Sequence, residues 1–311
     1  QAAVIATAGA DAPYINGGNV INKGVELNFT WDDKIGKDFR YNLGANFAYN
    51  KNEVGKIPTS DGLIHGSTGV MRDNQTEFYR CEDGHAMGFF WGYKTAGIFQ
   101  SQDEINKWKA AGNGLSFGSA TTAGDVKYVD VNHDGTIDDK DKVDLGNGIP
   151  KYNFGFNAGF TYKNFDFSTS WIGAAGFKIA AGGYRNWGNS SQANYTTYFL
   201  KRWVGEGTSN KVPHVTTDDR NWTNFSDLWL QKGDYLRIAN VTLGYDFAKL
   251  LSCKYISEAR LYAQAQNLYT FTKFNGMDPE IGFGQDAWVS GIDTGTYPRA
   301  RTFLFGVNIK F

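Results

Sequence analysis

The chain has 311 residues, a net charge of −1 and a mean hydropathy of −0.44. The near-neutral charge excludes the broad basic surface that nucleic-acid binding uses, and the absence of any apolar run near eighteen residues excludes a transmembrane helix. Aromatic residues make up 16% of the chain and 38 residues are glycine, which favours strands and turns over long helices. A transmembrane β-barrel is compatible with this composition, because its strands alternate apolar and polar residues and average out as hydrophilic.

Seven segments alternate apolar and polar residues with a period of two. Near the start of the chain, for example, Val25 and Leu27 share one face of the expected strand, while Glu26 and Asn28 share the other. This period predicts strands that have one apolar face. The expected strands cover residues 22–31, 39–50, 152–162, 165–171, 235–247, 259–272 and 299–311.

The connections between these strands alternate in length. Short connections cover residues 32–38, 163–164 and 248–257, and long ones cover 51–151, 176–233 and 273–298. Bacterial outer-membrane barrels combine short periplasmic turns with long extracellular loops in this way, and carry aromatic girdles at the interfaces. Aromatic residues gather at the short-turn ends: Trp31, Phe39, Tyr162, Phe165, Tyr245, Phe247 and Phe311. We therefore predict an all-β fold, part of a transmembrane antiparallel barrel.

The strand count also predicts missing neighbours. Seven strands cannot close a barrel that has an even number of strands, so the first strand needs an upstream partner. The chain starts at Gln1 in the middle of the pattern, and we expect an upstream fragment of the same barrel to precede it. A hairpin within residues 51–151 would raise the count to nine, which leaves the same requirement.

The long region 51–151, expected to be extracellular, has local signals of its own. Residues 88–94 are a candidate strand. Ser101 followed by Glu104 matches a helix capping box, which predicts a short helix that ends before Gly112. Two cysteines do not make a disulfide framework, so Cys81 and Cys253 are expected to be free thiols.

The same region contains an acidic loop, residues 130–141, with the pattern D-x-N-x-D-G-x-I-x-x-x-D. Its spacing is that of a calcium loop in which position 6 is glycine and position 7 offers its carbonyl. Oxygen ligands favour Ca²⁺, with Mg²⁺ the weaker candidate because it requires tighter geometry. The alternative is a solvated acidic turn. The expected ligands are Asp130, Asn132, Asp134, Thr136, Asp138 (through water) and Asp141.

The sequence carries no catalytic constellation. We find no nucleophile elbow, Walker or dinucleotide-binding motif, and the four histidines lack zinc spacing. The protein is therefore predicted not to be an enzyme. Aromatic residues in the long connections could stack on sugars, but packing within the loops is the better interpretation for each. These residues are Trp187, Trp203, Trp222, Trp229, Trp288, Tyr184, Tyr195 and Tyr198. No substrate-binding residue is assigned.

Seven segments spread over most of the chain resemble one family. They are NKGVELNFTW, YNLGANFAYNKNEV, GFFWGYKTAGIFQSQDEI, GDVKYVDVNHDGTIDDKDKVDLGNGIPKYNFGFN, YLRIANVTLGY, AQAQNLYTFTKFNGMDPE and YPRARTFLFGVNIKF. In this order they are similar to the C-terminal part of the SusC/RagA-type TonB-dependent transporters of Bacteroidota. The terminal Phe311 also resembles the C-terminal aromatic residue of outer-membrane proteins.

The resemblance implies a protein of the outer membrane with a 22-stranded barrel, whose plug domain and TonB-binding segment are absent from residues 1–311. It implies TonB-dependent import of oligosaccharides or peptides, with TonB and a SusD-like surface lipoprotein as partners. The polar stripe expected to face plug or water, opposite the lipid, consists of Arg40, Asn42, Asn46, Asn153, Asn157, Asn240, Gln264, Gln266, Asn308 and Lys310. The alternative function is a secreted, calcium-stabilised β-sandwich that binds glycans.

Overall fold

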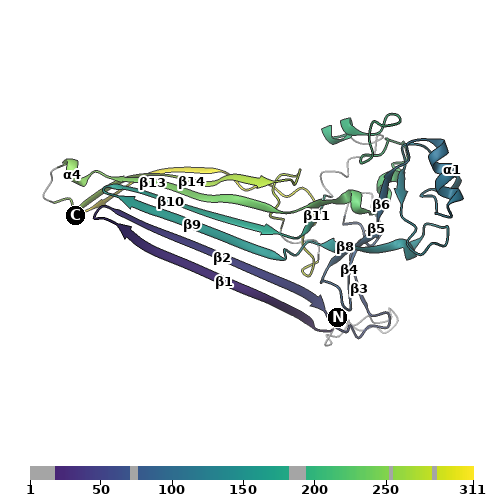
Figure 1. The fold of residues 1–311 in the computed structure, drawn as a ribbon, viewed down its shortest axis with the longest axis horizontal. Coiled ribbons are helices and arrows are strands. Elements are labelled where there is room, and N and C mark those ends of the chain that lie inside the picture. Colours follow the sequence, from purple (N-terminus) through teal and green to yellow (C-terminus); the bar gives the residue numbers. More distant parts are fainter. Residues whose placement is uncertain (1–17, 71–75, 182–193, 252–254, 282–285) are drawn as a thin grey trace, which may run out of the picture.

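One seven-stranded antiparallel sheet, here called the wall, forms the long body of the protein (Figure 1). The computed structural model describes residues 18–70, 76–181, 194–251, 255–281 and 286–311. The wall strands, in spatial order, are β1 (Val20–Ile35), β2 (Phe39–Val54), β9 (Tyr152–Tyr162), β10 (Phe165–Ala175), β13 (Tyr235–Asp246), β14 (Glu258–Thr272) and β15 (Thr302–Lys310). This order follows the chain, and the all-β fold with a partial barrel wall, predicted from the sequence, is confirmed.

The strand boundaries differ from the prediction at several ends. β1 continues to Ile35, so the expected turn at 32–38 shrinks to three residues, and β10 continues to Ala175. The last strand begins at Thr302 and not at residue 299. The alternation in sequence marks only where one face is apolar. Backbone pairing continues past that point wherever the neighbouring strand is long enough to supply partners.

The pairing register keeps the apolar residues of successive strands on one face of the wall. Leu243 of β13 pairs with Phe167 of β10 and with Ala263 of β14, which in turn pairs with Phe305 of β15. Residues that pair in an antiparallel sheet point to the same face. This face is open: Phe305 is 81% exposed and Leu27 is 62% exposed. A sandwich would bury such a face against a second sheet, so its exposure counts against the sandwich alternative.

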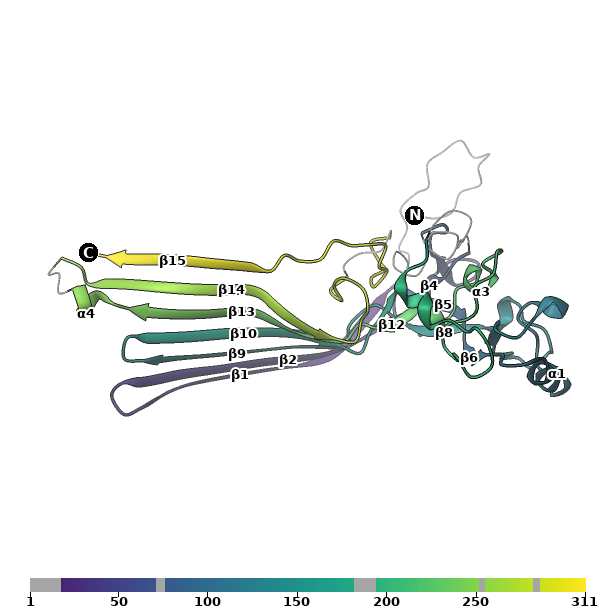
Figure 2. The same cartoon turned by 90° about the horizontal axis from the view of Figure 1, so that it is seen from above.

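The three long connections fold together into a second body at one end of the wall, here called the loop layer (residues 55–151, 176–234 and 273–301) (Figure 2). It contains three small antiparallel sheets. These are β3 (Leu63–His65), β4 (Tyr79–Glu82), β5 (Phe89–Tyr93) and β8 (Lys142–Asn147); β6 (Thr95–Ile98) with β7 (Val126–Tyr128); and β11 (Lys178–Ala180) with β12 (Leu230–Lys232).

The described helices are few and short. They are α1 (Gln102–Ala110), α3 (Arg220–Thr223) and α4 (Ala248–Leu251). Single 3₁₀ turns occur at Gly118–Ala120, Asp139–Asp141, Thr197–Lys201 and Asp227–Trp229. Within the described ranges, no helix has the length and apolar character needed to cross a membrane. The candidate strand at 88–94 is confirmed as β5, which belongs to the loop layer and adds no strand to the wall.

Helix α1 begins at the residue that the sequence indicated. The hydroxyl of Ser101 accepts a hydrogen bond from the Glu104 N–H at 3.3 Å, as an N-cap should. The reciprocal half of the expected capping box is different: the Glu104 carboxylate accepts from the Gln100 N–H, one residue upstream, and forms an ion pair with Lys127. Glu104 therefore joins the helix start to β7.

Replacing Ser101 with alanine is expected to loosen α1 alone. Loss of an N-cap costs about 1 kcal/mol, so amide hydrogen exchange in residues 102–110 should accelerate about fivefold. Mass-spectrometric exchange on the full-length protein measures this. Asn106→Ala, an exposed substitution in the same helix that improves helix propensity, is the control and should not accelerate exchange. Equal exchange in Ser101→Ala and wild type would contradict the capping role.

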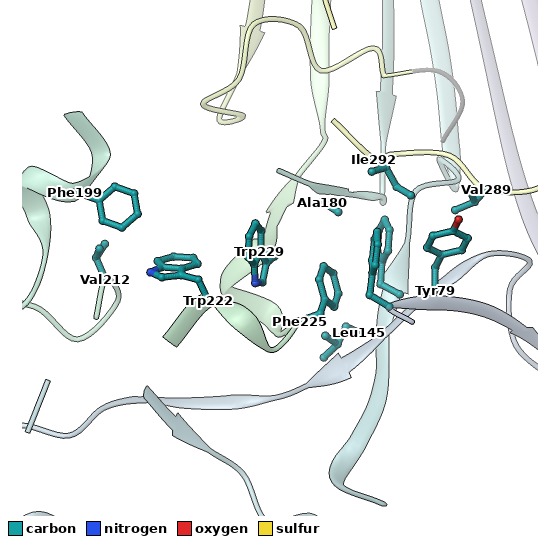
Figure 3. Packing of buried hydrophobic residues seen from close by; sticks show 12 residues of the cluster. Tyr79, Leu145, Ala180, Phe199, Val212, Trp222, Phe225, Trp229, Val289 and Ile292 are labelled. Atoms are coloured by element: carbon teal, nitrogen blue, oxygen red, sulfur yellow. The ribbon is translucent and has the colours of Figure 1, made fainter. Parts of the chain in front are cut away.

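The core of the loop layer is aromatic and draws on all three long connections. Tyr79, Leu145, Trp222, Phe225, Trp229 and Ile292 all belong to one buried cluster (Figure 3). Trp229 is fully buried, and its ring meets Trp222 edge-on with centroids 5.5 Å apart. Such a core gives the long loops a fixed shape, because its members come from three separate connections, from Tyr79 to Ile292, and can be buried only together.

Cys81 is buried and unpaired, as expected, and burial raises the pKa of its thiol. The same prediction for Cys253 falls outside the described residues.

Candidate functional site

The residues of the predicted polar stripe lie together on the polar face of the wall. Asn42 of β2 pairs with Gly159 of β9, and Asn240 of β13 pairs with Gln266 of β14. The register puts all ten residues of the stripe on the face opposite Leu243 and Phe305, as the alternation predicted. Whether this face contacts a plug or water stays a prediction.

Side chains on the polar face bond to one another across strands. Gln264 donates from its amide to Asn240 Oδ1 at 3.1 Å, and Arg260 makes a two-bond ion pair with Asp166, two strands away on β10. Gly44 leaves room for a neighbouring amide, since a Cβ there would lie 2.3 Å from Asn157 Oδ1. The face is therefore a hydrogen-bonded surface that is hydrophilic without carrying a strong net charge.

A buried arginine joins the wall to the loop layer. Arg237, near the loop end of β13, is 1% exposed and donates to Asp278 and Glu280 at 2.5 and 2.7 Å. Its Nε also donates to Thr270 of β14 at 2.9 Å. With two carboxylates and a hydroxyl as partners the buried charge is fully compensated. The cluster holds the third long connection against the wall.

A buried carboxylate joins the first and second long connections. Asp125 is fully buried; His214 Nε2 lies 2.8 Å from its Oδ1, and Arg220 Nη2 donates to its Oδ2 at 2.7 Å. The Asn221 amide and the Thr122 N–H also donate to it. Burial alone would raise the pKa of Asp125, but these hydrogen bonds and the charge of Arg220 hold the pKa below its ordinary value. Asp125 is ionised at neutral pH and organises the segments around it.

Further polar contacts hold the connections together. Tyr79 and Ser67 both donate to Asp286 of the third connection, at 2.6 and 3.0 Å, and Thr95 donates to Asp227 at 2.6 Å. With the aromatic core, these contacts make the loop layer one packed unit and not a set of separate loops.

The acidic loop lies at the surface of this unit and folds as a chain of short turns. Asn132 Oδ1 accepts from the Asp134 N–H, and Asp134 Oδ1 accepts from the Thr136 N–H. Asp138 and Asp141 form a capping box around the 3₁₀ turn Asp139–Asp141. Asp130 Oδ2 accepts from the Gly135 N–H at 2.8 Å and from the Gly114 N–H at 3.1 Å.

The predicted ligands thus belong to one loop, but their carboxylates do not yet converge. Among the described residues, no group of three or more histidine, cysteine, aspartate or glutamate side chains is close enough to hold a metal ion. Two of the six expected ligands, the Asn132 amide oxygen and the Thr136 carbonyl, are not of these residue types. The metal prediction is therefore untested.

Most of the aromatic residues of the long connections pack in or against the core of the loop layer, as the packing interpretation predicted. Trp222 and Trp229 are buried in the core, and Trp288 packs against it. Trp203 donates from its indole N–H to Gln100. Tyr195 and Tyr198 also pack on the core, whereas Trp187 and Tyr184 lie outside the described residues.

Comparison with known proteins places this architecture in a class. No family model matches the chain. TonB-dependent receptor P3 of Formosa agariphila is 30% identical over 315 residues, which cover 97% of this chain and 30% of that protein. TonB-dependent receptor SusC of Bacteroides thetaiotaomicron is 28% identical over 301 residues, which cover 95% of this chain and 27% of that protein. The chain spans less than a third of the length of these curated relatives.

Solved structures show the same fold. A structure of the RagAB peptide transporter matches with a TM-score of 0.72 at 20% identity, over 98% of this chain and 31% of the matched chain. The RagAB peptide importer in its closed-closed state matches with a TM-score of 0.70. The chain belongs to the TonB-dependent receptors. Within them it resembles the SusC/RagA type, since SusC is among the curated relatives and the RagAB transporter has the same fold.

Asp125 and Arg237 were not identified from the sequence. Apart from Thr122, the partners of Asp125 lie 89 to 96 residues away in the chain, and those of Arg237 lie 33 to 43 residues away. No local spacing therefore indicates these contacts. The signal that the sequence does carry is a charged residue inside an otherwise apolar strand pattern, as with Arg237 in YLRIANV. Such a charge has to find partners when it is buried.

Proposed function

We propose that this chain forms part of the barrel and the extracellular loops of a TonB-dependent importer in the outer membrane. The observation that carries the proposal is the wall itself: one face is apolar and open across seven strands, and the other is a hydrogen-bonded polar surface. An outward apolar face suits lipid, and a polar inner face suits a lumen. The likeness to TonB-dependent receptors over 97% of the chain supports the same conclusion.

In this proposal the short turns are periplasmic and the loop layer is extracellular. The complete barrel has 22 strands, and a plug and a TonB-binding segment in the rest of the protein control passage through its lumen. The packed loop layer suits a rigid mouth on which a second protein docks. We infer that this second protein is a SusD-like surface lipoprotein, and the likeness to the RagAB transporter and to SusC supports it.

The cargo is an oligosaccharide or a peptide too large for porins, taken up as a nutrient. The structural neighbours are described as a peptide transporter or importer, but at 20–21% identity this likeness concerns the fold and does not choose between the two classes. The polar face offers amide hydrogen-bonding groups, which suit sugar hydroxyls and peptide groups equally. This part of the chain carries out no bond chemistry in the proposal.

Co-purification is the first test. The full-length protein is extracted from outer membranes in detergent, and everything recovered with it is identified by mass spectrometry. We expect the upstream barrel and plug on the same polypeptide, together with a surface lipoprotein. Recovery from the soluble fraction without either would overturn the importer and favour a secreted glycan-binding protein.

Uptake then identifies the cargo class. Cells that carry the protein are supplied with labelled oligosaccharides or labelled peptides, with and without a functional TonB. The proposal expects accumulation of one class, lost when TonB is absent. Accumulation of the label that persists without TonB would contradict energised import.

A further inference from the structure

Asp130 presents a buried carboxylate oxygen that no group in the described part of the chain satisfies. Its side chain is buried, with the residue 1% exposed, and its Oδ1 has no hydrogen-bond partner among the described residues. Its Oδ2, by contrast, accepts from Gly135 and Gly114. A buried oxygen without a partner carries its full desolvation penalty, and the two N–H groups that bond to Oδ2 leave Oδ1 uncompensated. Because Oδ2 bonds across the loop to Gly135, the carboxylate faces the inner side of residues 130–141.

The backbone of the same loop bends sharply on either side of Asp134. His133 and Gly135 have φ angles of 59° and 80°, in the left-handed region. Two left-handed residues so close together turn the chain sharply twice. The Asn132 and Asp134 oxygens are held by N–H groups two residues further along. Each such oxygen keeps a second lone pair that can bind a cation without breaking the existing hydrogen bond.

We propose that residues 130–141 bind one calcium ion, with Asp130 Oδ1 as the first ligand. Side-chain oxygens of Asn132, Asp134 and Asp141 and the carbonyl of Thr136 complete the site, and Asp138 acts through water. An all-oxygen ligand set selects a hard cation, and a loop whose ligands have to move inward suits Ca²⁺ better than the rigid octahedron of Mg²⁺. The loop carries five aspartates against one lysine, so the ion also relieves repulsion among them.

The ion would act on more than the loop. Asp130 already bonds to the N–H of Gly114, and a Cβ on Gly114 would lie 2.8 Å from the Thr136 carbonyl carbon. The turn that follows α1 is thus packed directly on the proposed site. Drawing the carboxylates together would fix residues 112–141 as one unit. Calcium would therefore brace the part of the loop layer that lies farthest from the short-turn end, where α1 is seen in Figure 1.

Hydrogen exchange on the full-length, detergent-purified protein tests this, and the readout does not depend on transport. The protein is stripped with a chelator and measured with no metal, with Ca²⁺ and with Mg²⁺, each up to about 10 mM, since loops of this kind bind at about 10⁻⁴ to 10⁻³ M. We expect Ca²⁺ to slow exchange in residues 112–141 at least about tenfold, with no change in the wall.

Three variants make the result specific. Asp130→Asn and Asp134→Ala should abolish the calcium effect, whereas Asp139→Ala should retain it. Alanine is used at position 134 because asparagine would still offer a ligand oxygen there. Asp139 is the matched control, because it lies in the same loop and its side chain is 87% exposed and paired with Lys142. Asp134 is exposed, so Asp134→Ala leaves the fold intact even where Asp130→Asn loosens it. No calcium effect in the wild type, an undiminished effect in Asp134→Ala, or equal protection by Mg²⁺ would overturn the assignment.

Discussion

Replacing Val241 with arginine is expected to destabilise the folded barrel by about 2–4 kcal/mol and to reduce its assembly in the outer membrane. Val241 belongs to the apolar face of the wall, since it pairs with Thr169 of β10 and Ala265 of β14 in the same alternation as Leu243. In the proposed orientation this face meets lipid, where no water reaches the guanidinium and the paired neighbours Thr169 and Ala265 offer it no carboxylate.

The position along the strand sets the size of the effect. Val241 lies four residues from Tyr245, which ends the apolar face near the short turn. At about 3.3 Å per residue and a tilt of about 40°, this places Val241 roughly 10 Å into an apolar band about 25 Å tall. It is therefore near the midplane. Arginine closer to the interface would cost only about 0–1 kcal/mol.

Thr242→Arg is the matched control, because it makes the same kind of change one residue away on the opposite, polar face. Both variants are introduced into the full-length gene, and folding is followed by heat-modifiable gel mobility and by denaturant titration in lipid vesicles. The free energy of unfolding of Val241→Arg should be lower than that of Thr242→Arg by at least about 2 kcal/mol. Equal stability of the two variants would contradict the assignment of the apolar face to lipid.

The wall was predictable because its signal is local. Alternation in residues such as Val25 to Asn28 assigns the two faces of a strand, and short turns such as Lys163-Asn164 join neighbours that are consecutive in the chain. The start of α1 at Ser101 was predictable for the same reason, since an N-cap and its helix are adjacent. The acidic loop is another local pattern, and the structure adds to it the unsatisfied oxygen of Asp130.

The loop layer was not predictable beyond a few elements. Its strands have three to six residues, and β7 is buried along its whole length, so neither length nor alternation identifies it. Its organising contacts join residues far apart in the chain, such as Tyr79 with Asp286 and Thr95 with Asp227. Their positions follow from tertiary packing, about which a single sequence carries no periodic signal.

Removing the charge of Asp125 is expected to have the largest effect within the loop layer. Asp125→Asn keeps the size of the side chain but leaves Arg220 without its buried counter-ion, and turns one acceptor into a donor that faces His214 and Asn221. Breaking a buried ion pair from one side costs about 3–5 kcal/mol. Residues 95–128 and 203–225 should therefore open together, with hydrogen exchange faster by at least about a hundredfold, while the wall exchanges as in the wild type.

Acid should reproduce this opening in the wild type. The pKa of Asp125 is lower in the folded protein than its ordinary value near 3.9. A depressed folded pKa contributes stability that is complete above the unfolded pKa and is lost as the pH falls through the folded pKa. After correction for intrinsic rates, hydrogen exchange in residues 95–128 and 203–225 should thus not depend on the Asp125 carboxyl from about pH 5 upward. It should accelerate below about pH 4 as this carboxyl is protonated.

The variant and the titration together separate this mechanism from general acid damage. Asp125→Asn should already be open at pH 7 and should lose the acid-induced step, because it has no carboxyl to protonate. Glu206→Gln is the control: it neutralises an exposed carboxylate in the second long connection, which supplies His214 and Arg220. It should retain both the wild-type exchange at pH 7 and the step in acid. If Asp125→Asn instead exchanged like the wild type at pH 7, the Asp125 cluster would not be what joins the first two long connections, and the aromatic core alone would hold them.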